Sequence, residues 1–169
     1  MRTIIRSIDS ISEWTGKSVS WVCVVLILVL CYEVLMRYVF NSPTFFAHEL
    51  STMIGGTIAA LGWTYTHRYH GHVRVDVIYT HLTPRGKALV DVILTLLLFF
   101  PLLGILIMNS TESLLFAIKM GEVMRGSFWY PPAWPIKMIM VVGLSLFALQ
   151  GAAHFVRDFY LLVKDKPYD

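Results

Sequence analysis

Four apolar stretches without a charged side chain recur along the chain, and the segments between them hold most of the charged residues. The stretches are residues 18–32, 50–66, 92–111 and 138–153. A helix needs about 20 residues to cross a bilayer core about 30 Å thick, so each stretch is long enough once its flanks are included. The pattern predicts four transmembrane helices, at about residues 16–39, 47–67, 89–112 and 135–157.

Two further segments have an amphipathic pattern. In residues 1–14, large apolar residues follow helical spacing with charged residues between them: Ile4, Ile5, Ile8, Ile11 and Trp14. This pattern is typical of a helix at the membrane surface, with a cleaved signal peptide as the alternative; we expect the N-terminus to be retained. Residues 113–134 are expected to lie partly along the outer surface. The sequence thus predicts an all-α integral membrane protein, a single domain over residues 1–169, with an N-terminal interfacial helix and an amphipathic periplasmic segment.

Composition and charge agree with a membrane protein. Of the 169 residues, 56% are hydrophobic and only 15% are charged, which does not suit a soluble domain of this size. Ten Lys and Arg side chains belong to the N-terminus, the second loop and the tail, and four to the opposite side. Because cytoplasmic flanks hold more basic residues, both termini are predicted to be cytoplasmic. This bias explains the net charge of +3 without a nucleic-acid partner.

An acidic and a basic residue follow each other near the end of the first apolar stretch. Glu33 and Arg37 are four residues apart, so their side chains can pair on one helical face. Charged groups are unfavourable in lipid, so the pair should face other helices, water or a partner. Arg37 could also reach Glu49, where the second stretch begins. We expect Glu33, Arg37 and Glu49 to form a structural or interface ion network, with a proton or ion relay as the alternative.

Small residues mark a close-packing surface in the second stretch. Gly55, Gly56, Ala59 and Ala60 form two overlapping pairs at a spacing of four, which lets another helix backbone approach closely. We expect these four residues to be a helix-packing interface. The neighbouring helix belongs either to the chain's own bundle or to a second polypeptide.

The histidines raise the question of a cofactor, since His67, His70 and His72 lie close together after the second stretch. Haem would need axial ligands facing each other from different helices, whereas these residues lie in a loop or at a helix end. A loop that contacts headgroups explains the cluster better than a metal site does. We expect no metal or other cofactor, and no enzyme, because no nucleophile with a base and no phosphate loop is recognisable.

Several motifs, in this order, resemble the small membrane subunit of the tripartite ATP-independent periplasmic (TRAP) transporters. The residues that carry the resemblance are Glu33, Arg37, Tyr38, Val39, Phe40, Asn41, Pro43, Glu49, Gly62, the run 71–76 and the aromatic, proline-rich run 130–135. The resemblance covers nearly the whole chain. The chain departs from the family pattern just before the second helix. The family often has tryptophan and paired acidic residues there, whereas this chain has Phe46, Ala47 and His48 before a single Glu49. The role of a second carboxylate is therefore not carried over.

The resemblance implies a three-part bacterial or archaeal importer of organic acids such as dicarboxylates or sialic acid. A periplasmic binding protein captures the substrate, and a large membrane subunit carries it with a sodium gradient in an elevator-like cycle. The small subunit would be a scaffold in the bacterial inner membrane. Its expected partners are the large subunit, in a stable heterodimer, the binding protein, transiently, and membrane lipids. Sodium coupling is expected in the large subunit and not in this chain.

Two further sets of residues gain roles from this resemblance. His72, Arg74 and Asp76 are expected to form a cytoplasmic loop clasp, and Arg125 and Trp129 to contact a periplasmic partner. The alternative function is a small homodimeric proton-coupled exporter in which Glu33 exchanges protons for substrate. Arg37 argues against it, because a neighbouring guanidinium holds the carboxylate in its ionised form.

Overall fold

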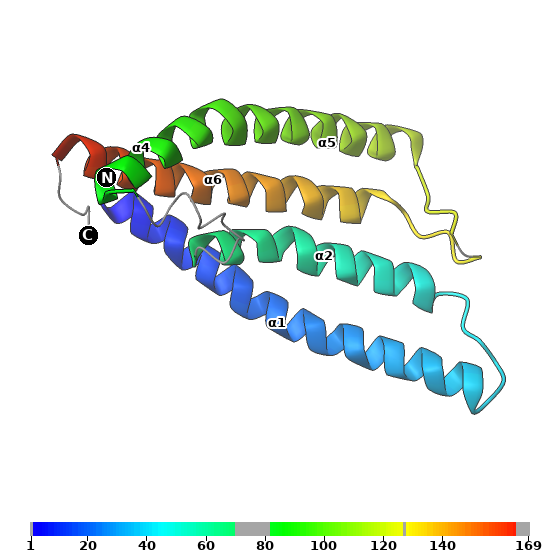
Figure 1. Ribbon diagram of the computed structural model, residues 1–169. Coiled ribbons are helices and arrows are strands. Elements are labelled where there is room, and N and C mark those ends of the chain that lie inside the picture. Colours follow the sequence, from blue (N-terminus) through cyan, green and yellow to red (C-terminus); the bar gives the residue numbers. More distant parts are fainter. Residues whose placement is uncertain (1, 70–81, 127, 165–169) are drawn as a thin grey trace.

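The computed structural model describes residues 2–69, 82–126 and 128–164 (Figure 1). Its elements are the helices α1 (Arg2–Tyr38), α2 (Ala47–Arg68), α4 (Pro84–Leu94), the π-helix η1 (Thr95–Phe99), α5 (Phe100–Met120) and α6 (Trp134–Lys164). The described residues contain one isolated β-bridge, between Val123 and Pro132, and no named strand. The prediction of an all-α protein is therefore confirmed. The predicted loop clasp, His72, Arg74 and Asp76, lies outside the described residues.

Helix α1 runs without interruption through 37 residues. The predicted boundary between an interfacial helix and the first transmembrane helix does not appear as a break. Hydroxyl groups near that boundary bond to the preceding turn, with Thr15 Oγ1 donating to the Ile11 carbonyl at 2.8 Å, so they do not interrupt the helix. At 1.5 Å per residue the helix is about 55 Å long, which exceeds a bilayer core of about 30 Å. A surface position for its first turns remains a prediction.

Three helices in the described residues are long and apolar enough to cross a membrane: Ile5–Tyr38, Arg85–Met120 and Trp134–Lys164. Helix α2 is not among them, although its 22 residues give it sufficient length. Its glycine, serine, threonine and histidine residues lower its apolar content. Hydroxyls of α2 bond to its own backbone, as Thr57 Oγ1 does to the Met53 carbonyl at 2.8 Å. The fourth transmembrane crossing therefore remains a prediction.

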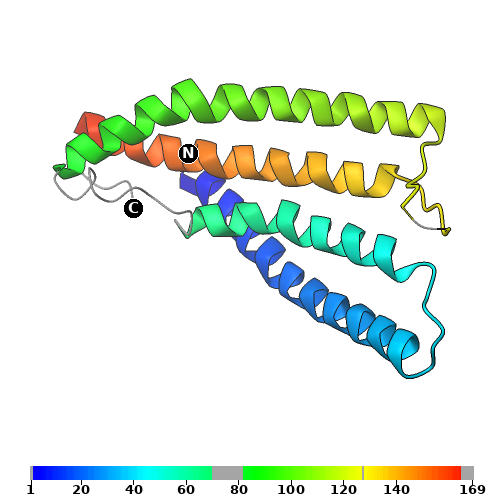
Figure 2. The same cartoon turned by 45° about the vertical axis from the view of Figure 1, so that its right-hand side comes forward.

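The third long helix bends where α4 passes through η1 into α5 (Figures 1 and 2). Pro101 lies just after η1; it has no N–H and its ring crowds the carbonyl four residues earlier, which explains the wider π turn. Gly151 on α6 makes room at this bend, because a Cβ there would lie 2.1 Å from Phe99 Cε1. Helix α5 continues to Met120 and ends at Gly121, whose φ of 61° is left-handed. Residues 113–120, expected in the surface segment, are thus helical.

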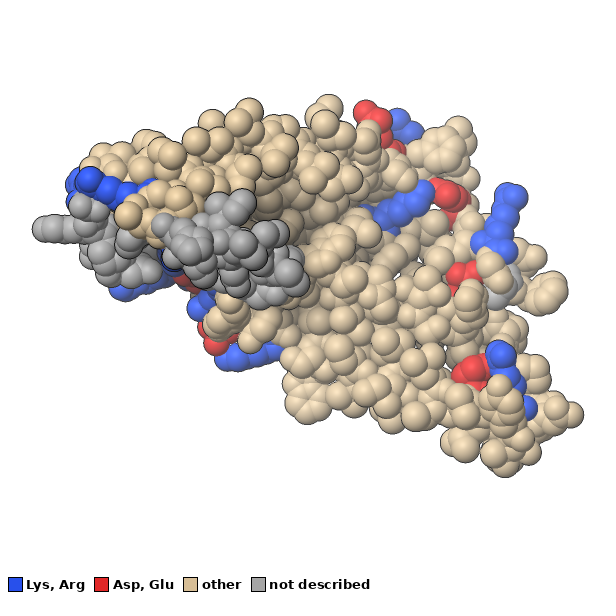
Figure 3. Space-filling view, in the orientation of Figure 1, with Lys and Arg blue, Asp and Glu red and all other residues tan. Residues whose placement is uncertain are grey.

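Helix α2 lies between α1 and α6, and α5 lies against the other side of α6 (Figures 1 and 2). Small residues allow close packing at the centre, where Ala60 is fully buried. Figure 3 shows that charged side chains gather toward the two ends of the helices and leave an uncharged surface between them. This is the distribution expected of helices that cross an apolar layer.

Candidate functional site

Glu33 and Arg37 form an ion pair at the C-terminal end of α1. In the orientation predicted from the basic residues, this end of the bundle is the outer end and the opposite end is the inner end. Glu33 Oε1 accepts hydrogen bonds from Arg37 Nη2 at 2.6 Å and Nε at 3.0 Å. The second carboxylate oxygen accepts from the Thr44 backbone N–H at 3.2 Å and from the Thr44 hydroxyl. Asn41 completes the turn with a φ of 50°, a left-handed conformation that asparagine tolerates better than most residues. Glu33 therefore fastens the loop between α1 and α2 to the end of α1.

Glu49 is separate from this pair. It lies in the first turn of α2, is only 3% exposed and faces the segment that follows α5. A Cβ added at Gly126 would lie 2.6 Å from Glu49 Oε1, so the carboxylate lies directly against the backbone of that segment. Among the described residues, Oε1 has no hydrogen-bond partner. Of the three residues expected in one network, Glu33 and Arg37 are bonded to each other, whereas Glu49 faces the segment that follows α5.

The four small residues of α2 face two directions. A Cβ on Gly56 would lie 3.2 Å from Ile136 Cδ1, and Ala60 packs on α6, where a Cβ on Gly143 would lie 2.6 Å from the Ala60 carbonyl oxygen. Gly55, by contrast, has nothing within 4 Å of such a Cβ, and Ala59 is exposed. One pair packs within the chain and the other points away from it.

Aromatic contacts connect the outer segment to the α1–α2 loop. Trp129 packs edge-on against Phe46, with ring centroids 6.3 Å apart, and Phe46 stacks on Tyr32 at 6.4 Å. Arg125 is exposed, and 39% of the Trp129 surface remains accessible. The two residues predicted to contact a periplasmic partner are therefore accessible at the outer end, one of them with a structural contact as well.

A polar cluster at the inner end was not predicted from the sequence. Ser12 donates a buried hydrogen bond to Gln150 Oε1 at 2.7 Å, Gln150 Nε2 donates to Asp9 Oδ1 at 3.1 Å, and Arg157 pairs with Asp9 Oδ2 at 2.5 Å. Arg68 of α2 connects to the same part of α1 through an ion pair between its Nη1 and Glu13 Oε2, at 3.0 Å. These residues tie α1, α2 and α6 together. The available signal was Gln150, a polar residue in an apolar helix, whose partners are about 140 positions away.

His67 and His154 contact each other at the same end, with ring centroids 4.9 Å apart. His67 also stacks on Phe99 at 5.4 Å and packs edge-on against Phe147 at 5.0 Å. These two histidines are parts of an aromatic cluster. Within residues 2–69, 82–126 and 128–164, no group of three or more His, Cys, Asp or Glu side chains lies close enough to hold a metal ion.

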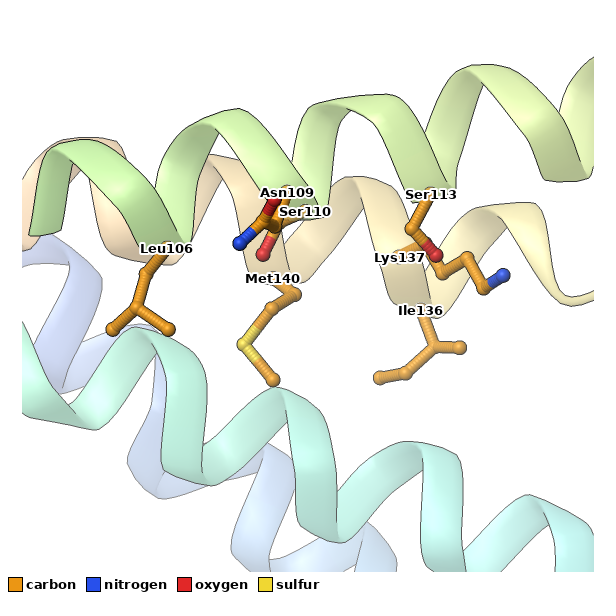
Figure 4. Close-up of a pocket in the computed structure, with 7 residues that line it drawn as sticks. All are labelled: Leu106, Asn109, Ser110, Ser113, Ile136, Lys137 and Met140. Atoms are coloured by element: carbon orange, nitrogen blue, oxygen red, sulfur yellow. The ribbon is translucent and has the colours of Figure 1, made fainter.

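Two cavities lie in this part of the bundle, one along α5 and α6 and the other between α2, the end of α5 and the segment that follows α5. The outer one, about 700 Å³, is lined by Glu49, Phe116, Met120 and residues 121–126. The inner one, about 310 Å³, is lined by three apolar residues, whose side chains point toward α2 in Figure 4, and by four polar or charged ones: Leu106, Ile136 and Met140, and Asn109, Ser110, Ser113 and Lys137. Lys137 lines the inner cavity and its ammonium group bonds to Glu122 of the outer cavity. One ion pair therefore joins the linings of the two cavities.

Long apolar helices with charged groups at both ends define a helical integral membrane protein. Residues 26–160 match the sequence model of the family described as "Tripartite ATP-independent periplasmic transporters, DctQ component". The chain belongs to this family, the small TRAP transporter subunits, so the predicted resemblance is confirmed. No curated protein gave a significant match to the sequence.

Proposed function

We propose that the chain is the small permease subunit that scaffolds the large, sodium-coupled membrane subunit of an elevator-type importer. A periplasmic binding protein would deliver an organic acid to the large subunit. The chain would lie in the bacterial inner membrane with both termini in the cytoplasm, as the distribution of basic residues favours. The substrate and the coupling sodium ions would bind to the other components.

The observation that carries this proposal is how little of the longest apolar helices the chain itself buries. In the most apolar 18-residue part of Ile5–Tyr38, only 6% of the residues are buried by the rest of the chain. The share is the same in the most apolar part of Arg85–Met120. Polar groups, by contrast, are bonded to one another near the two ends of the bundle. Glu33 is bonded to Arg37 at one end, and Gln150 to Ser12 toward the other. A carrier needs polar groups around a site near the middle of the membrane, whereas a scaffold needs broad apolar faces for a larger partner.

We place the contact with the large subunit on the outward face of α2. Gly55 and Ala59 are four residues apart on this face, so they lie above each other and would let a partner helix approach closely. The ion pair of Glu33 and Arg37, at the outer end of α1, would add polar contacts at the edge of this interface. Arg125 and Trp129 are the proposed contact for a periplasmic partner, and His72, Arg74 and Asp76 the proposed cytoplasmic loop clasp.

Copurification tests the scaffold function. The tagged chain, extracted from its native membrane in mild detergent, should carry a stoichiometric polytopic subunit that mass spectrometry identifies. Gly55→Leu should lower the yield of this complex by about 5- to 150-fold, the equivalent of 1 to 3 kcal/mol of overpacking. Gly55→Ala, the matched control, keeps a small side chain and should retain the complex. Recovery of the chain only as a homodimer would contradict the proposal.

The exporter alternative loses support from the same observations. Both carboxylate oxygens of Glu33 accept hydrogen bonds, from Arg37 and from Thr44, which suits a fixed structural group better than one that must exchange protons. The family match also assigns the chain to a component of a tripartite system. Glu33→Gln should therefore reduce assembly or membrane levels and leave sodium coupling of the assembled transporter unchanged.

A further inference from the structure

Glu49 is a buried carboxylate, one oxygen of which accepts no hydrogen bond from the described residues. Its side chain is 3% exposed, and its Oε1 has no hydrogen-bond partner in the described part of the chain. Removing a carboxylate from water is strongly unfavourable unless a cation or several donors replace the water. Two basic groups at this end are already bonded to other carboxylates, Arg37 to Glu33 and Lys137 to Glu122. The site is therefore complementary to an external group that donates hydrogen bonds and carries positive charge.

The cavity beside Glu49 has both a polar and an apolar side. Phe116 and Met120 line it and are 56% and 69% exposed, respectively. Arg125, also exposed, lines the same space. The outer cavity thus combines one unpaired acceptor, one accessible guanidinium and two large apolar side chains. A group that fits it carries a positive and a negative charge and is attached to an apolar chain.

The inner cavity lies further along α5, and the Lys137–Glu122 ion pair joins its lining to that of the outer cavity. Its apolar lining residues are Leu106, Ile136 and Met140, and their side chains are directed toward α2 in Figure 4. The rest of its lining is polar and consists of Asn109, Ser110, Ser113 and Lys137. From Leu106 to Met120 the helix rises by about 21 Å at 1.5 Å per residue. With Met120 at the headgroups, the groove would pass well into a bilayer core about 30 Å thick. Its length and orientation match a lipid chain in the outer leaflet.

We propose that this groove binds one phospholipid whose headgroup carries a primary amine. The ammonium group would donate to Glu49, the phosphate would lie near Arg125 and Lys137, and one acyl chain would follow the inner cavity. A choline headgroup has no N–H to donate, so it would leave the Glu49 oxygen unpaired. An anionic headgroup without an amine would place its charge beside Glu49 and Glu122. The inference depends on the proposed membrane orientation but not on the large subunit.

Native mass spectrometry of the purified full chain in mild detergent tests the site. The chain is offered equal amounts of dioleoylphosphatidylethanolamine, dioleoylphosphatidylcholine and dioleoylphosphatidylglycerol. The wild-type chain should retain one ethanolamine lipid with a preference of at least about tenfold over the other two, as a hydrogen bond between charged groups provides. Equal retention of the three lipids would overturn the proposal. This is the result expected if Arg125 itself neutralises Glu49. Because the wild-type comparison needs no variant, it does not depend on the folding of a mutant.

Two matched variants then assign the preference to one carboxylate. Glu49→Gln should abolish the ethanolamine preference, whereas Glu112→Gln should keep it, because Glu112 is an exposed carboxylate of α5 that lines neither cavity. Circular dichroism should show unchanged helix content in both. An unchanged preference in Glu49→Gln, or the same loss in both variants, would overturn the site. Since the chain is tested alone, either result is independent of whether it copurifies with a large subunit.

Discussion

Gly143→Ala should destabilise the chain, although alanine is normally the better helix former. Gly143 lies where α6 crosses α2, and a Cβ there would lie 2.6 Å from the Ala60 carbonyl oxygen and 3.1 Å from the Ala60 Cβ. Ala60 is fully buried, so neither helix can turn the contact toward open space. To restore an ordinary contact of 3.4 Å, the helices would have to separate by about 0.8 Å at this point. Backbone atoms cannot yield as a flexible side chain does.

Two opposing terms determine the size of the effect. Overpacking of this kind costs about 1 to 3 kcal/mol, whereas replacing glycine by alanine within a helix contributes about 0.8 to 1.0 kcal/mol of stability. Gly62→Ala is the matched control, because a Cβ on Gly62 has nothing within 4 Å and the change is chemically the same. The free energy of unfolding of Gly143→Ala should therefore lie about 1 to 3 kcal/mol below that of Gly62→Ala.

The assay is unfolding of the purified chain from mild detergent into increasing fractions of sodium dodecyl sulfate, followed by circular dichroism and tryptophan fluorescence. The comparison of two glycine-to-alanine variants removes the contribution of helix propensity. If Gly143→Ala were as stable as Gly62→Ala, the close approach of α2 and α6 would be wrong. A loss confined to Gly62→Ala would place the tight contact on the other face of α2.

Two further predictions concern the polar ends of the bundle. Gln150→Leu should lower the free energy of unfolding by about 1 to 3 kcal/mol in the same assay, because it removes the hydrogen bond from Ser12 and the one to the Asp9 carboxylate, although the Ser12 hydroxyl keeps the Ile8 carbonyl as an acceptor. A change below about 0.5 kcal/mol would mean that these hydrogen bonds do not hold α1 to α6. Thr44→Val should speed proteolysis of residues 39–46, because one of the hydrogen bonds to Glu33 is lost, while the helix content stays constant. Unchanged cleavage would contradict the role of Glu33 in fastening this loop.

The helical character of the chain follows from its sequence because long apolar runs leave the backbone no other way to satisfy its polar groups in a membrane. The pairing of Glu33 with Arg37 could also be predicted from the sequence, since both residues belong to one helix and their spacing sets the geometry. The hydrogen bonds from Thr44 to Glu33 could not be predicted, because they depend on how the loop after α1 folds back. Local spacing therefore predicted the pair but not its third member.

Contacts between distant helices could not be derived in the same way. Gln150 was recognisable as a polar residue in an apolar helix, but nothing local indicated that Ser12 and Asp9 would meet it. The spacing of the small residues in α2 left their partner open for a similar reason. A period of four defines a stripe on a helix and does not tell which neighbour covers it. The direction of each stripe required the packing of α2 against α6.

The sequence of α2 serves two packing surfaces by repeating one pattern with an offset of a single residue. One residue turns an α-helix by about 100°, so the pairs Gly55/Ala59 and Gly56/Ala60 point in clearly different directions. The second pair is in contact with α6, whereas the first has open space before it. A glycine at position 56 is therefore explained within the chain, but a glycine at 55 is not, and helix propensity alone would favour alanine there. This unexplained glycine is the physical reason to seek a second polypeptide on that face, and it makes Gly55→Leu a sharper test of assembly than any change at Gly56.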